Sequence, residues 1–473
     1  MIDPGGPGPI RPWPASGLLT DLYHVDAAYV AWRTGSNAQA TFELYTRGLP
    51  FGGGFLLLAG LEAAATFARD FRYSDDELAF LATVKPYDPA FLAMLGSVRF
   101  TGEIAAIPEG TVAFANEPLV RVTAPFIEAL LMESGLLHAI GLETLIATKA
   151  ARVVHAARGR PVTEFAFRRA QEPFAVARAA AIGGCVATSF VAAARAYGIP
   201  AAGTIPHALI QAFDDEAAAF RAVAETLDHF TLLLDTYDPR HAIHTAAAVA
   251  HEAERRWGHT LDAVRLDSGD LGADSRYVRS VLDDAGLQTV KIVVSSDLDE
   301  FSIDALLRDG APIDGFGVGT SVGVGTGPAS RGIEGGSLGT VYKLVAYGDD
   351  QGRGSPGRIK LAGPKSTWPG IKQVHRRGDF DGDVISLVSE QPPAGSQPLL
   401  AAVMEDGTLH PGALPPLGEI RERAKGQLAA LPLPYHALTA PPPYPVQWSD
   451  ALVDLRQQTS DRPWQGEHAR ARD

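Results

Sequence analysis

The feature that most constrains the fold of this chain is a regular alternation of short apolar runs and longer helical stretches in its middle region. The last five runs begin at residues 201, 230, 263, 291 and 314, and most of the intervals between them hold amphipathic stretches such as "PRHAIHTAAAVAHEAERRWG". An earlier run begins at residue 161. This spacing is typical of repeated βα units in a parallel sheet. We therefore predict an α/β fold built around a (β/α) barrel.

Polar residues stand where these runs end. They are Arg168 and Arg169, His207, Asp235 and Asp238, Asp267 and Asp270, Ser295 to Asp297, and Thr320. In a (β/α) barrel the loops that follow the strands build the active site, so these side chains predict a catalytic face. Such residues also cap the helices that follow, and "SDLDE" offers one such cap from Ser296 to Asp299. For His207 alone, a capping or packing role remains the alternative.

The regions on either side of the barrel have a different pattern of apolar and polar residues. "VRFTGEIAAI" and "EGTVAFANEPLVRVTAP" alternate apolar and polar residues, which predicts an antiparallel, half-buried sheet. "DDELAFLATV" and "LGEIRERAKGQLAAL" are helical patterns. We expect a flexible arm at 1–17, an α+β domain at 18–145, the barrel at 146–345, a C-terminal segment with an active-site loop at 346–458, and a flexible tail at 459–473.

Charge and cysteine content exclude several classes of function. The chain has 41 basic and 55 acidic residues, a formal net charge of −14, which argues against a nucleic-acid or membrane-surface partner. An anionic substrate would need a local basic pocket. No apolar run approaches the roughly 20 residues that cross a bilayer. The single cysteine, Cys185, rules out a disulfide framework and predicts a reducing, cytoplasmic location.

Two motifs suit a phosphorylated sugar. "RLDSGD", from Arg265 to Asp270, pairs an arginine that can bind phosphate with carboxylates that can bind ribose hydroxyls or a Mg²⁺ shell. An internal Arg–Asp ion pair is the alternative. "GFGVGTSVGVGTG", from residue 315 to 327, lets backbone amides approach a phosphate, although it lacks the Gly-Lys-Ser/Thr ending of a P-loop.

Three further motifs leave alternatives open. In "TEFAFRRAQ", Phe165 and the two arginines that follow it suit the binding of a flat anionic ring. The alternative is that Phe165 is a core residue and the two arginines lie on the surface. "KLAGPKSTWPGIKQVHR" is an anion-binding flap or a solvated basic loop. The histidines of "HAIHTAAAVAHE" fit a solvated helix face better than a metal site, because no cysteine or acidic partner has zinc-ligand spacing.

Together the motifs resemble nicotinate phosphoribosyltransferase over about residues 18 to 450. They are, in order, "LLTDLYHVDAAYVAW", "RGLPFGGGFLLLAGLE", "EGTVAFANEPLVRV", "ETLIATKAARV", "EFAFRRAQ", "GTIPHALI", "LLDTYD", "RLDSGDL", "GFGVGTSV", "VYKLV", "KSTWPGIKQV" and "YPVQWS". The resemblance implies an irregular α/β barrel and a second α+β domain formed by N- and C-terminal segments. It also implies transfer of phosphoribosyl from phosphoribosyl pyrophosphate to nicotinate, coupled to ATP hydrolysis, with Mg²⁺ at the pyrophosphate, for NAD synthesis.

The resemblance also assigns roles to residues. His207 matches the histidine that ATP phosphorylates, and Asp235 resembles its orienting carboxylate. The phosphate candidates are Arg265, Arg168 and the backbone around Gly317, Gly319 and Thr320; the ribose candidates are Asp267, Ser295 and Ser296. No metal ligand is assigned. Phe165 resembles one side of an aromatic sandwich around the pyridine ring, and Tyr23 resembles the other, contributed by the second subunit of a homodimer with shared active sites.

Two departures from the family pattern concern the base. Ala166 replaces a glycine, and Cys185 and Val186 replace a segment that contains an aspartate. Another phosphoribosyltransferase of the same type, acting on nicotinamide or quinolinate, is therefore the first alternative. A non-catalytic nucleotide-binding homologue is the second alternative. The residues that speak against it are intact: His207, Asp235, Arg265 and Asp267.

Overall fold

The computed structural model describes residues 16–327, 336–348, 357–361 and 365–462. Contacts divide the chain into two compact units. Residues 145–336 form the first, here named the barrel unit. The described residues of 16–144 and 337–462 form the second, here named the split unit because its two segments are far apart in the sequence. Most of the expected arm at 1–17 and of the expected tail at 459–473 lies outside the described residues.

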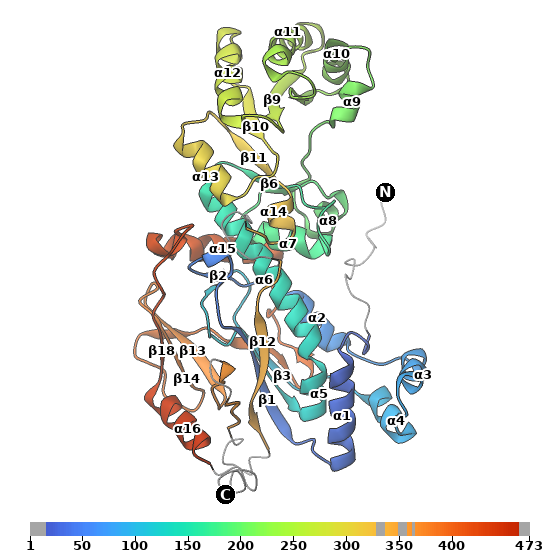
Figure 1. The fold of residues 1–473 in the computed structure, drawn as a ribbon, viewed down its shortest axis with the longest axis vertical. Coiled ribbons are helices and arrows are strands. Elements are labelled where there is room, and N and C mark those ends of the chain that lie inside the picture. Colours follow the sequence, from blue (N-terminus) through green and yellow to red (C-terminus); the bar gives the residue numbers. More distant parts are fainter. Residues whose placement is uncertain (1–15, 328–335, 349–356, 362–364, 463–473) are drawn as a thin grey trace, which may run out of the picture. The chain divides into compact units, whose positions relative to one another are not determined.

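The barrel unit contains a parallel sheet in the order β7-β6-β11-β10-β9-β8. Figure 1 labels its middle strands, β6, β11, β10 and β9. Its strands are β6 (Val162–Glu164), β7 (Ala187–Thr188), β8 (His229–Leu233), β9 (Thr260–Leu266), β10 (Lys291–Val294) and β11 (Gly315–Val318). The strand that is last in sequence, β11, pairs with the first, β6, as in a barrel. The predicted α/β class is confirmed, as a curled sheet whose two ends are β7 and β8.

Helices follow the strands of this sheet. They are α7 (Pro173–Ile182), α8 (Val191–Tyr197), α9 (His207–Gln211), α10 (Glu216–Thr226), α11 (Pro239–Trp257), α12 (Leu271–Asp284), α13 (Glu300–Arg308) and α14 (Thr320–Gly323). Four begin where an aspartate accepts hydrogen bonds from first-turn amides: Asp215 caps α10, Asp238 caps α11, Asp270 caps α12 and Asp299 caps α13. The cap expected in "SDLDE" therefore starts at Asp299 and not at Ser296.

N- and C-terminal segments share the larger sheet of the split unit. Its order is β12-β1-β5-β3-β16-β17, and every pairing is antiparallel. The strands are β1 (Gln39–Thr46), β3 (Glu103–Ala106), β5 (Val120–Pro125), β12 (Thr340–Tyr347), β16 (Ala401–Glu405) and β17 (Thr408–Leu409). Alternate residues of β5 are buried, as the sequence pattern predicted. The expected domain made of N- and C-terminal segments is confirmed in this shared sheet.

Two smaller sheets complete the split unit: β15 (Ser396–Pro398), β13 (Lys372–Arg377), β14 (Asp383–Leu387) and β18 (Val446–Trp448) in that order, and the pair β2 (Leu56–Leu57) and β4 (Val112–Ala113). Its helices are α1 (Leu22–Thr34), η1 (Pro50–Gly52), α2 (Leu61–Asp70), α3 (Asp75–Val84), α4 (Pro89–Ser97), α5 (Phe126–Leu131), α15 (Leu417–Ala430), η4 (Leu433–His436) and α16 (Asp450–Ser460). The long α6 (Glu133–Ala156) contains the boundary between the units. None of the helices within the described ranges is long and apolar enough to cross a membrane.

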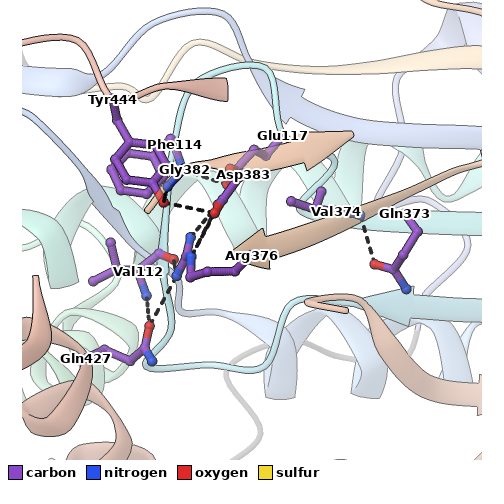
Figure 2. Close-up of polar contacts among 10 residues, drawn as sticks. All are labelled: Val112, Phe114, Glu117, Gln373, Val374, Arg376, Gly382, Asp383, Gln427 and Tyr444. Atoms are coloured by element: carbon purple, nitrogen blue, oxygen red, sulfur yellow. Dashed lines mark hydrogen bonds and ion pairs between the residues drawn. The ribbon is translucent and has the colours of Figure 1, made fainter. Parts of the chain in front are cut away.

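A buried polar cluster joins the two segments of the split unit (Figure 2). Arg376 donates to Asp383 through Nη2 at 2.7 Å and to the carbonyl of Val112 at 2.9 Å. Tyr444 donates its hydroxyl to Asp383 at 2.9 Å. Burial raises the pKa of Glu117 well above its ordinary value, and the neighbouring charge of Asp383 raises this pKa further. The amide of Phe114 donates to Oε2 of Glu117 at 2.8 Å, and Oε1 of Glu117 is buried without a hydrogen bond from any described residue.

The structure differs from the prediction for part of the basic segment "KLAGPKSTWPGIKQVHR", because one of its lysines is buried. Lys372 lies on β13, is buried, and pairs with Glu43 of β1 at 2.9 Å. Its Nζ also donates to the carbonyls of Trp368 and Gly370. Lys372 is thus part of the interior of the split unit, neither a flap nor a solvated residue. Residues 362–364 of this segment lie outside the described residues.

Candidate active site

Arg265 is the centre of a polar cluster at the carboxyl ends of the barrel strands. It is the second-last residue of β9, and its side chain is 13% exposed. Its guanidinium donates to Ser295 through Nε, to Thr204 through Nη1 and to Asp267 through Nη2, each at 2.7 Å. One planar group with donors in fixed directions can join the ends of β9 and β10 to the loop before α9 in this way. The internal Arg–Asp ion pair considered as an alternative is therefore present.

Asp267 follows β9 and completes the cluster. Its Oδ1 accepts hydrogen bonds from both Arg265 and Ser295. Burial raises the pKa of Asp267, but the hydrogen bond from Ser295 and the charge of Arg265 outweigh burial, so the pKa is below its ordinary value. The group is therefore a carboxylate at neutral pH, with Oδ2 turned toward His207.

His207 is the first residue of the short helix α9. Its Nε2 lies 3.7 Å from Oδ2 of Asp267, and its Nδ1 lies 3.1 Å from Oγ1 of Thr236, in the turn after β8. The side chain is 38% exposed, so a ligand can reach it. The sequence prediction that His207 lies among the strand-end residues of the barrel agrees with this geometry.

Asp235 lies beside this cluster without contacting the imidazole. Its Oδ2 accepts from the amide of Asp267 at 2.9 Å and from the hydroxyl of Ser268 at 2.5 Å, which ties the turn after β8 to the turn after β9. The residue is 9% exposed, and its Oδ1 is buried without a hydrogen bond from any described residue. The structure therefore gives Asp235 and His207 separate partners.

Phe165 and the glycines of β11 fit against each other. The Phe165 amide donates to the carbonyl of Val318 at 2.8 Å. A Cβ on Gly317 would lie 2.3 Å from Cε2 of Phe165, so only glycine leaves room for this ring. The guanidinium carbon of Arg265 lies 5.7 Å from the centre of the ring, within the range of a cation–π contact. Thr320 is exposed and begins α14, with Gly319 before it as the cap residue.

The two serines after β10 differ. Ser295 is buried and bonded to Arg265 and Asp267. Ser296 is exposed and has φ 130°, in the region of positive φ that a residue with a side chain rarely adopts. Local strain of this kind is common at binding and catalytic sites. The structure thus makes Ser295 a support of the cluster and leaves the Ser296 hydroxyl open to solvent.

The remaining predicted residues are exposed. Arg168 lies in the turn after β6, outside the Arg265 cluster. Tyr23 belongs to α1 of the split unit, where it is 58% exposed and its ring lies 3.9 Å from that of His24. Of the two departures from the family pattern, Ala166 and Cys185 are buried, whereas Val186 is exposed.

Sequence reasoning missed several residues that hold the site together. Glu164 is buried at the end of β6 and accepts from the amide of Ala166 and the hydroxyl of Thr188. Burial raises the pKa of Glu164, although both hydrogen bonds oppose this. Three missed hydroxyls are those of Thr204, Thr236 and Ser268. Each of these residues is one to three positions from a predicted site residue. That proximity in the sequence could have indicated them as members of the site.

Family models match segments near both ends of this chain. Residues 18–141 match the nicotinate phosphoribosyltransferase N-terminal domain, and residues 392–456 match the C-terminal domain of that family. The chain is 43% identical to nicotinate phosphoribosyltransferase pncB2 of Mycobacterium tuberculosis over 447 residues, 92% of each chain. It is 40% identical to the Bacillus subtilis nicotinate phosphoribosyltransferase over 384 residues, 79% of this chain and 76% of the relative.

A solved structure supports the same relationship. The crystal structure of human nicotinic acid phosphoribosyltransferase superimposes with a TM-score of 0.80 at 30% identity, covering 93% of this chain and 100% of that one. Nicotinate-nucleotide pyrophosphorylase from Pyrococcus furiosus shares the fold, with a TM-score of 0.70 at 24% identity over 88% of this chain and 95% of that one. From its sequence relatives and its fold, the chain belongs to the nicotinate phosphoribosyltransferase family.

Proposed function

We propose that this protein transfers the phosphoribosyl group of phosphoribosyl pyrophosphate to nicotinate, with ATP hydrolysis coupled to the transfer. The products are nicotinate mononucleotide and pyrophosphate, which supply NAD biosynthesis. The observation that carries the proposal is the Arg265–Asp267–Ser295 cluster with His207 beside it, at the carboxyl ends of adjacent parallel strands. Relatives that carry this enzyme name, at 43% and 40% identity, support the proposal.

The cluster suits the charges that develop during the transfer. Displacing pyrophosphate from ribose C1 makes the sugar cation-like and concentrates negative charge on the leaving group. Arg265 is a guanidinium that already donates to one anion, the carboxylate of Asp267, and such a group suits a phosphate. Asp267 remains ionised and can accept hydrogen bonds from ribose hydroxyls. A phosphate would compete with Asp267 for Arg265, so substrate binding would loosen an internal ion pair.

The described residues fit a Mg²⁺ ion that arrives with the substrate. Within the described ranges no group of three or more acidic, histidine or cysteine side chains could hold a metal by itself. Mg²⁺ usually keeps several waters and takes one or two carboxylates together with substrate phosphates. Asp235 and Asp267 would hold it, and Oδ1 of Asp235 is a buried oxygen without a hydrogen bond from the described residues. When bound, the ion supplies positive charge for the leaving pyrophosphate.

His207 is the proposed site of phosphorylation by ATP. Its imidazole is accessible, lies beside the anion-binding cluster, and is a good nucleophile near neutral pH. Hydrolysis of the phosphohistidine would help to drive the transfer forward. In this proposal Asp235 acts on the site through the turn after β9, because its Oδ2 accepts hydrogen bonds from Asp267 and Ser268 of that turn.

The base is proposed to stack on Phe165, with its carboxylate near Arg168. Tyr23 of a partner subunit would cover the other face of the ring, in a homodimer with shared active sites. Two observations support this: Phe165 is held beside Gly317 at a strand end, and Tyr23 is largely exposed although it is aromatic. An exposed aromatic side chain is typical of a contact made with another molecule.

The proposal is tested by an activity matrix. Pyrophosphate release is measured with nicotinate, nicotinamide or quinolinate, each with and without ATP. Nicotinate turnover stimulated by ATP supports the proposal; preference for another base assigns the protein to the corresponding phosphoribosyltransferase, and no turnover with any base indicates a non-catalytic homologue. The Arg265→Lys variant should be nearly inactive. Arg255→Ala, on the exposed face of α11, is the matched control and should retain full activity.

A direct test of His207 is labelling with γ-labelled ATP. The wild-type protein should acquire an acid-labile, base-stable label. The His207→Asn variant should remain folded but lose both the label and ATP hydrolysis. If this variant still hydrolyses ATP in step with product formation, then His207 has only a structural role.

A further inference from the structure

The imidazole of His207 is held by a hydroxyl. Thr236 lies in the turn after β8, and its Oγ1 is 3.1 Å from Nδ1 of His207. On the other side of the ring, Nε2 is 3.7 Å from Oδ2 of Asp267, beyond hydrogen-bonding distance. Thr236 is thus the one described residue hydrogen-bonded to this ring. The contact joins residues 29 positions apart in the sequence.

The turn that carries Thr236 is itself anchored. The preceding residue, Asp235, is almost completely buried and accepts hydrogen bonds from the Asp267 amide and the Ser268 hydroxyl. These contacts fix the backbone immediately before Thr236 relative to the end of β9. The same strand end also carries Arg265 and Asp267. The Thr236 hydroxyl therefore has a defined position relative to the cluster that faces Nε2.

From this geometry we infer that Thr236 is a positioning residue for His207: its Oγ1 accepts the Nδ1 proton and so presents Nε2 to the Arg265–Asp267 cluster. A neutral imidazole carries one proton, so the nitrogen that donates to Thr236 leaves the other with a free lone pair. A threonine is suited to this because its branched Cβ restricts the hydroxyl to few rotamers. Asp235 acts on His207 indirectly, because it holds the turn that carries Thr236.

The consequence for the reaction rests on the proposed function, in which His207 accepts a phosphoryl group. The lone pair of Nε2 would form the new N–P bond while the bond from the γ-phosphorus to the bridging oxygen breaks and ADP leaves. Nδ1 keeps its proton and its hydrogen bond to Thr236 throughout. Without the hydroxyl the ring can turn or place its proton on Nε2, and either change removes the nucleophile.

The test compares Thr236→Val, which removes the hydroxyl at nearly the same volume, with Thr236→Ser, which keeps it. Thr231→Val is the matched control, because Thr231 lies on β8 and its hydroxyl makes no hydrogen bond to any described residue. Two readouts are recorded for each folded protein. The first is the ¹⁵N chemical shift of each imidazole nitrogen of His207, without ATP, assigned by comparison with His207→Asn. The second is the rate of ATP-dependent labelling, set against transfer to nicotinate without ATP.

We expect the Thr236→Val protein to show a changed ¹⁵N tautomer pattern for His207 and labelling slowed roughly two- to tenfold, the worth of one hydrogen bond. Transfer without ATP should change less than labelling does, and Thr236→Ser should restore both readouts. Wild-type nitrogen shifts in Thr236→Val would overturn the inference, as would an equal loss in Thr236→Ser. If the wild type takes no label while the nitrogen shifts still respond to Thr236→Val, the positioning role stands and the phosphohistidine proposal fails.

Discussion

Replacing Gly317 by alanine would test whether the ring of Phe165 must lie where the structure places it. The added methyl would be 2.3 Å from Cε2, 2.6 Å from Cδ2 and 3.2 Å from Cζ of that ring. Carbon atoms in contact are normally about 3.5–4.0 Å apart, so the nearest ring edge has to retreat by more than about 1 Å. Phe165 is only half-buried, so its ring can move while the strand stays in place.

The expected cost to stability is therefore small and the cost to activity large. Overpacking a site costs about 1–3 kcal/mol. A ring that can move puts this variant near the lower end, a fall in Tm of about 1 °C for a chain of 473 residues. A displacement of about 1 Å at a positioned group can lower the rate by about 10²-fold. We expect kcat/KM for nicotinate to fall roughly ten- to a hundredfold, measured by pyrophosphate release.

A double-mutant cycle separates this mechanism from general damage to β11. In a Phe165→Ala background there is no ring for the new methyl to displace, so Gly317→Ala should then have little further effect. Gly418→Ala is the matched control, because a Cβ there meets no atom within 4 Å. The reasoning is wrong if Gly317→Ala keeps wild-type kcat/KM, or if its effect is the same with and without the Phe165 ring.

Three other predictions concern the base, the dimer and the split unit. Arg168→Ala should reduce the preference for nicotinate over nicotinamide by about ten- to a hundredfold, since a charge-assisted contact is worth about 1.5–3 kcal/mol; an unchanged ratio of kcat/KM values would exclude this arginine. Mixed Tyr23→Ala and Arg265→Ala chains should recover part of the activity that each lacks alone, whereas a fully active monomer in light scattering would refute a shared site. Because the pKa of Glu117 is raised, its stabilisation is present below the unfolded pKa and is lost as pH rises through the folded pKa. The Tm of Glu117→Gln should therefore fall less than that of the wild type as pH rises above the ordinary pKa of a glutamate, and parallel curves of Tm against pH would show that another group titrates.

The sequence by itself determined the order of the elements and the strand ends at which the polar residues of the site stand. Apolar runs at βα spacing predict parallel strands, and the carboxyl ends of such strands meet at one edge of a sheet. For that reason His207, Arg265 and Asp267 could be expected near one another before any coordinates existed. Helix starts were also readable in part, because Asp238 and Asp270 stand directly before α11 and α12.

Only the tertiary structure decided which of these groups contact each other. Asp235 and Asp238 are three residues apart and alike in chemistry, yet the first bonds to the turn after β9 and the second caps a helix. Arg265 reaches hydroxyls 30 and 61 positions away in the sequence, and Lys372 finds Glu43 in the interior of the split unit. Whether a hydrogen bond forms depends on the donor–acceptor distance to within a few tenths of an ångström and on its direction. These are set by strand register and side-chain rotamers across the whole sheet, and local sequence does not specify them.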